Sequence, residues 1–88
     1  MKLPKQIKIG GLTYKINFIE GLTDCGSTHF DTQTILINKG QTEERQVSAL
    51  IHEIIECENE LYDLNLSHQT IQTLEAGLFQ ILNDNFIK

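Results

Sequence analysis

Two segments within the first 40 residues alternate apolar and polar side chains with a period of two, the pattern of half-buried β-strands. The alternation runs through Gln6 to Ile9 and through Leu12 to Glu20, and Gly10-Gly11 between them suits the positive φ angles of a tight turn. A second pair of short segments, Ser27 to Phe30 and Thr34 to Asn38, has the same layout of two arms around a turn. The sequence therefore predicts a short antiparallel sheet made of two hairpins.

After Gly40 the hydrophobic period changes to that of an α-helix, and Thr42 is suited to cap its N-terminus. A core-facing helix from Glu43 to Tyr62 is predicted by one apolar stripe: Val47, Leu50, Ile51, Ile54 and Leu61. Ser67 caps a second predicted helix, which ends at Asn85 and has the stripe Ile71, Leu74, Leu78, Ile81 and Leu82. The short connection implies two antiparallel helices on one face of the sheet, so the expected fold class is α+β.

Length and charge narrow the function classes. At 88 residues the chain has room for one domain, with the sheet in 1–40 and the helical pair in 42–88. Seven Lys+Arg against twelve Asp+Glu give a net charge of −5, which argues against nucleic acid and anionic membrane surfaces as partners. No apolar run approaches the roughly 18 residues of a membrane span, and none follows the N-terminal lysines as in a signal peptide, so we expect a cytoplasmic protein.

The cysteine content is low. Cys25 and Cys57 are too few for the disulfide framework of a small secreted protein, and they do not form a CxxC pair. We expect two small, mostly buried, unpaired side chains, although a disulfide between them is compatible with the sequence.

Candidate chemistry lies on the first predicted helix, in the segment His52-Glu53-Ile54-Ile55-Glu56. The i, i+4 spacing of His52 and Glu56 places an imidazole and a carboxylate one helical turn apart, where together they can hold a divalent ion. Glu53 is turned away from both and can reach a water at the metal without being a ligand. His68, at the start of the second helix, would complete the two-His, one-Glu set of a catalytic zinc site. Glu75 is the alternative third ligand, or a partner that orients His68.

The segment from His52 to His68, with Ile71, Leu74 and Leu78 after it, resembles small phage and prophage proteins with a minimal zincin-like fold. In those proteins a short antiparallel sheet precedes an HExxH or HExxE helix, and a second helix provides the remaining ligand. The opening segment Lys8 to Lys15 also resembles their first hairpin, so the likeness covers most of the chain. The resemblance implies that His52, Glu56 and His68 are metal ligands and that Glu53 is the general base.

The expected function is a small zinc-dependent hydrolase, a metallopeptidase of phage or prophage origin by the resemblance. Zn²⁺ at this position would lower the pKa of a bound water toward neutrality and polarise the scissile carbonyl, and Glu53 would accept the water's proton. The strand Thr34 to Asn38 would be the sheet edge along which a peptide or protein substrate lies. Two alternatives stay open: a non-catalytic binding or inhibitor module on the zincin scaffold, and a solvated helix face where His52 and Glu56 form only a surface hydrogen bond.

Overall fold

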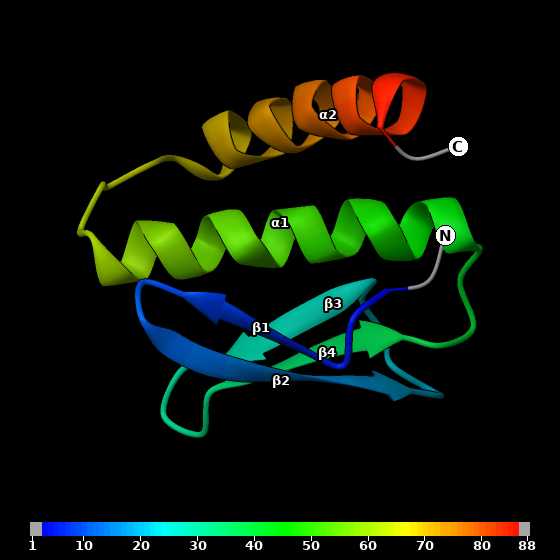
Figure 1. Cartoon of the computed structure of the whole chain (residues 1–88), viewed down its shortest axis with the longest axis horizontal. Coiled ribbons are helices and arrows are strands. Elements are labelled where there is room, and N and C mark those ends of the chain that lie inside the picture. The colour runs from blue at the N-terminus through cyan, green and yellow to red at the C-terminus, as the bar shows by residue number, and fades with distance from the viewer. Residues whose placement is uncertain (1–2, 87–88) are drawn as a thin grey trace.

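Within residues 3–86, which the computed structural model describes, the chain forms four strands and then two helices, so the α+β prediction is confirmed. The elements are β1 (Gln6–Ile9), β2 (Leu12–Ile19), β3 (Gly26–His29), β4 (Thr34–Asn38), α1 (Glu43–Leu61) and α2 (His68–Asn85). Figure 1 shows them in three layers: the sheet, α1 across one face of the sheet, and α2 on the far side of α1. Neither helix of this described part has the length and apolar character that crossing a membrane requires.

The predicted first hairpin is confirmed. β1 and β2 are antiparallel, and their pairing closes with Ile9 opposite Leu12. The two-residue turn requires glycine because Gly10 and Gly11 have φ angles of +58° and +83°. A side chain at Gly10 would also collide with Leu61 at the end of α1. The glycine pair therefore both forms the turn and lets the hairpin approach the helix.

The sheet is mixed, with strand order β1-β2-β4-β3, so the prediction of a purely antiparallel sheet is wrong. β3 and β4 do form an antiparallel hairpin, but β4 lies beside β2 and parallel to it, with Ile16 opposite Ile35. The prediction that Thr34–Asn38 is a sheet edge is wrong for the same reason. β4 lies inside the sheet because it supplies Ile35 and Ile37, which are 0% exposed. The small and polar residues of Gly26–His29 tolerate the edge position instead.

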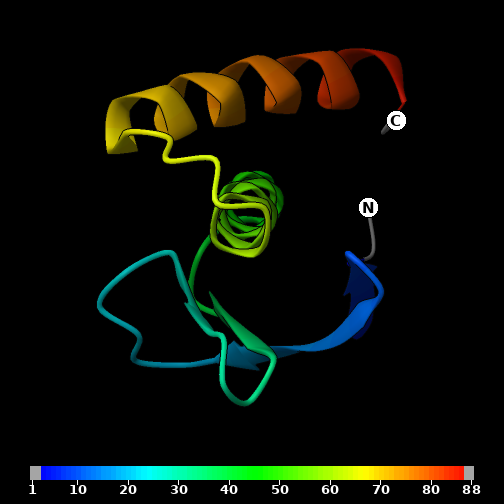
Figure 2. The ribbon, with the colours of Figure 1, turned by 90° about the vertical axis from the view of Figure 1, so that its left-hand side faces the viewer.

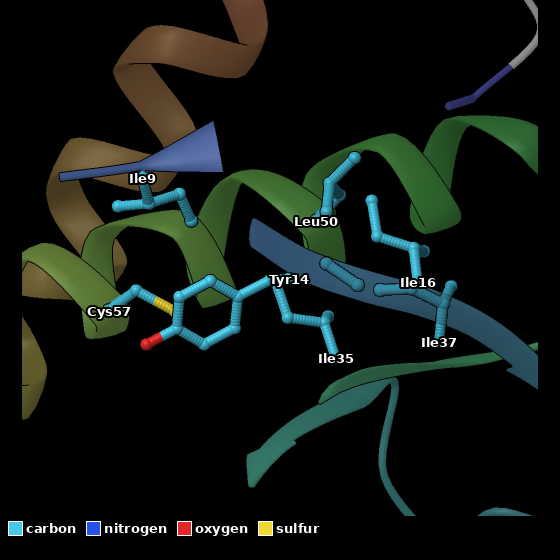
Figure 3. Close-up of a cluster of buried hydrophobic side chains, with 8 residues drawn as sticks. Ile9, Tyr14, Ile16, Ile35, Ile37, Leu50 and Cys57 are labelled. Atoms are coloured by element: carbon cyan, nitrogen blue, oxygen red, sulfur yellow. The ribbon is translucent and has the colours of Figure 1, made fainter. Parts of the chain in front are cut away.

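α1 is buried on two sides because it lies between the sheet and α2 (Figure 2). Toward the sheet it joins the larger hydrophobic cluster, which consists of Ile9, Tyr14, Ile16, Ile35, Ile37, Ala49, Leu50 and Cys57 (Figure 3). Toward α2 it forms a second cluster from Val47, Ile51, Ile55 and Ile71. Between these two buried sides, a third face of α1 lines an open cleft, and this face contains His52 and Glu56.

α2 packs on α1 and contacts no strand of the described chain, so the prediction that both helices cover the sheet is wrong. The helices run in opposite senses in Figure 1, but the view along α1 in Figure 2 shows α2 crossing over it rather than lying alongside. The predicted antiparallel sense of the two helices therefore holds, but α2 crosses α1 at an angle. Because only one side of α2 meets α1, Ile71 is buried while Leu74, Leu78 and Ile81 of the predicted stripe are 42–47% exposed.

Both predicted helix caps are confirmed. The Thr42 hydroxyl accepts a hydrogen bond from the backbone N–H of Arg45 at 3.3 Å, and the Ser67 hydroxyl accepts one from Thr70 at 3.1 Å. The second cap makes His68 the first residue of α2. The connection from α1 turns back through Asp63 and Asn65, both with positive φ, and so returns His68 to the side of α1.

Candidate metal centre

A cleft of about 680 Å³ lies where the middle of α1, the first half of α2 and the segment 24–27 meet. It is lined by Asp24, Cys25, Gly26, Ser27, Arg45, Ser48, Ala49, His52, Glu53, Glu56, His68, Gln72 and Glu75. On α1 the lining positions recur at helical spacing, because they form one continuous strip along the side of the helix. All the residues that the sequence analysis selected for chemistry therefore line one cavity.

The three predicted metal ligands converge. One ligating atom each from His52, Glu56 and His68 lies within 4.8 Å of the other two. The Nε2 atom of His52 is 3.4 Å from a carboxylate oxygen of Glu56, and the rings of His52 and His68 have centroids 5.9 Å apart. Zinc bonds of about 2.0–2.2 Å in a tetrahedron place neighbouring ligand atoms about 3.4 Å apart. The His52–Glu56 pair has that spacing, and His68 adds a second imidazole within the 4.8 Å limit of the group. Two imidazoles and a carboxylate are donors that suit a zinc ion.

Accessibility differs among the three residues. His52 and Glu56 are partly buried, whereas His68 is exposed, and all three line the cleft. A tetrahedral ion held by these three side chains would have its fourth position open to solvent, as in catalytic rather than structural zinc sites.

Glu53 also lines the cleft, on the side of α1 that faces the sheet. It is only 7% exposed, and its Oε1 accepts a hydrogen bond of 2.7 Å from the hydroxyl of Thr28 on β3. Burial raises the pKa of Glu53, because a buried carboxylate loses hydration, and the hydrogen bond from Thr28 only partly offsets this. A carboxylate with a raised pKa and one oxygen held by a donor has the properties of a general base.

Glu75 contacts the other ring nitrogen of His52. One of its oxygens lies 2.7 Å from Nδ1 of His52, and the second accepts a hydrogen bond of 2.6 Å from the Ser48 hydroxyl. Glu75 is therefore turned toward the back of His52, and His68 supplies the third converging atom. A carboxylate behind an imidazole is the usual support for a metal-binding histidine.

Both cysteines are free, as expected, but only Cys57 is also buried. Cys57 is buried, and burial raises the pKa of its thiol to about 11. The expectation that Cys25 is mostly buried is wrong: it is exposed and lines the cleft. Its loop is held at the surface by the buried amide of Asn38, whose Nδ2 donates to the carbonyls of Leu22 and Asp24 at 2.9 and 3.2 Å.

Sequence reasoning missed three supporting residues: Thr28, Ser48 and Asn38. Ser48 had a detectable signal, because it precedes His52 by one helical turn and so faces the same side of α1. Thr28 and Asn38 had no such signal. The contact of Thr28 with Glu53 depends on the position of β3 in the sheet, and Asn38 binds loop carbonyls 14 to 16 residues away in sequence.

Comparison with protein-family models, with curated proteins and with solved structures found no match for this chain. The zincin-like relationship therefore stays a prediction, and the geometry of the cleft is the observation that bears on function.

Proposed function

We propose that this chain is a small zinc-dependent hydrolase, a metallopeptidase with a zincin-like arrangement of its site. The observation that supports this most strongly is the convergence of His52, Glu56 and His68 within 4.8 Å, with the buried carboxylate of Glu53 lining the same cleft. Two imidazoles and one carboxylate are the ligand set of peptidase zinc sites, and an unligated carboxylate beside them is the group that hydrolysis needs.

In this proposal each side chain of the site has a different role in hydrolysis. Zinc, when bound, supplies a Lewis acid that acidifies water and polarises a carbonyl. Glu53 accepts the proton of the attacking water and later returns it to the leaving amine. Thr28 holds one oxygen of Glu53, which leaves the second oxygen for the proton. The burial that raises the pKa of Glu53 makes this return of the proton easier.

The position of the cleft favours an extended peptide as substrate. Among residues 3–86, β3 is paired with β4 on one side only, and Gly26 and Ser27 of β3 line the cleft. The outer edge of β3 therefore offers unpaired backbone groups beside the site, where an extended chain can add as a further strand. This edge replaces Thr34–Asn38, which lies inside the sheet.

The test is turnover of a mixed peptide library by the zinc-loaded protein, followed by mass spectrometry. We expect cleavage that a chelator stops and that Glu53→Gln abolishes while zinc binding stays intact, because a neutral amide cannot accept the proton. Glu58→Gln is the matched control, since Glu58 is exposed on the same helix and is not among the residues that line the cleft. Zinc binding without cleavage of any peptide would contradict the hydrolase and favour the non-catalytic binding module.

A further inference from the structure

Glu75 of α2 uses both oxygens of its carboxylate to bind α1. Its Oε1 lies 2.7 Å from Nδ1 of His52, and its Oε2 accepts a 2.6 Å hydrogen bond from the Ser48 hydroxyl. Ser48 and His52 are one helical turn apart, so the two contacts together fix the rotation of the carboxylate. All three side chains are partly buried, where hydrogen bonds are less weakened by water than at an open surface.

The distances decide which ring nitrogen of His52 holds its proton. Nδ1 is within the normal hydrogen-bond range of Glu75, whereas Nε2 is 3.4 Å from Glu56, beyond that range. A single ring proton is therefore best placed on Nδ1 and donated to Glu75. Nε2 then keeps its lone pair and faces the carboxylate of Glu56.

We propose that Glu75 is a positioning residue that holds His52 in the Nδ1–H tautomer and so presents Nε2 as a metal ligand. The inference rests on the proposed metal site, because a metal requires the lone pair of Nε2, but the tautomer is a property of the metal-free protein too. Glu75 thereby has a role that differs from both roles considered for it from sequence, as third ligand or as partner of His68.

The contacts of Glu75 with Ser48 and His52 also orient His68, the third proposed ligand. α2 packs on α1 alone, and Glu75 follows His68 by seven residues, about two helical turns. By binding two positions of α1, Glu75 fixes the rotation of α2 about its own axis. His68 is the first residue of α2, so its direction follows from that rotation.

The test is the tautomer of His52, read from the two ring-nitrogen chemical shifts in metal-free protein at pH 8. In the wild type we expect a protonated Nδ1 and an unprotonated Nε2, while exposed His29 serves as the internal solvated reference. Glu75→Leu should shift His52 toward the Nε2–H form that a solvated imidazole favours. Glu75→Gln should keep the Nδ1–H form of the wild type, because the amide oxygen can still accept that hydrogen bond. Gln80→Leu, on the same helix but exposed and not among the residues that line the cleft, should change nothing.

Zinc affinity is the second readout. Loss of a partner behind a metal-binding histidine weakens binding about 10- to 100-fold, so Glu75→Leu should do so while Gln80→Leu leaves the zinc affinity unchanged. An Nε2–H or doubly protonated His52 in the wild type, or one tautomer shared by wild type and Glu75→Leu, would overturn the proposal. A wild type with the expected tautomer that binds no zinc would instead overturn the proposed function, so the two failures are distinguishable.

Discussion

Replacing His68 with alanine separates metal binding from folding, because this residue is exposed at the start of α2. The Ser67 cap, which accepts its hydrogen bond from Thr70, does not involve the His68 side chain. Exposed substitutions away from caps and cores change stability by about 0.5 kcal/mol or less. Metal-free His68→Ala should therefore melt within about 2–4 °C of the wild type.

The effect of zinc should be much larger. A ligand at 100 times its dissociation constant adds about 2.7 kcal/mol to the folded state. For a domain of this size that corresponds to a rise in Tm of roughly 10–20 °C. If removal of His68 weakens binding by about 100-fold, the same zinc concentration adds only about 0.4 kcal/mol, or about 2–3 °C. His52 and Glu56 alone would then provide the remaining affinity.

The assay is a pair of thermal melts, with zinc and with chelator, for wild type, His68→Ala and His29→Ala. His29 is the matched control because it is exposed on β3 and is not among the residues that line the cleft. The control variant His29→Ala should show the same zinc-dependent rise in Tm as the wild type. An equal rise in His68→Ala and wild type would refute the assignment of His68 as a ligand, and an equal loss in both histidine variants would refute the location of the site.

Three further predictions concern Glu53, the cysteines and the first turn. Because the folded-state pKa of Glu53 is raised above its ordinary value of 4.5, its contribution to stability is complete below pH 4.5 and is lost as pH rises through the raised pKa. Denaturant titrations of zinc-free protein should therefore show stability falling over that window in the wild type and a flatter profile in Glu53→Gln. Iodoacetamide at pH 8 should modify exposed Cys25 but spare buried Cys57, whose pKa is about 11, and mass spectrometry showing Cys57 labelled in native protein would contradict the burial. Gly10→Ala should lower the free energy of unfolding by at least 1 kcal/mol more than Gly11→Ala, since both have positive φ but only Gly10 lacks room for a side chain. Equal losses in the two glycine variants would show that the hairpin does not pack closely on the helix.

Local signals in the sequence were enough to predict the elements. Gly10-Gly11, Thr42 and Ser67 each determine backbone conformation or hydrogen bonding within a few residues, and all three predictions are confirmed. The i, i+4 spacing of His52 and Glu56 is equally local, so their proximity follows once the helix forms.

The arrangement of the elements was harder to predict because it depends on contacts that are distant in sequence. The apolar run Ile35 to Ile37 in Thr34–Asn38 shows little alternation and does not by itself reveal the strand order. In the structure that strand lies beside β2, with Ile35 and Ile37 buried. The crossing of α2 over α1 likewise leaves Leu74 exposed although it fits an apolar stripe. Which nitrogen of His52 meets Glu75 depends on that crossing, so no sequence spacing could reveal it.

The most direct test of the central claim is the zinc content of the purified protein, measured by elemental analysis after dialysis against a low concentration of Zn²⁺. The geometry of His52, Glu56 and His68 predicts one zinc per chain in the wild type and a large loss in His68→Ala. A wild type that retains no zinc above the level of the dialysis buffer would contradict the proposed metal centre and favour a solvated helix face.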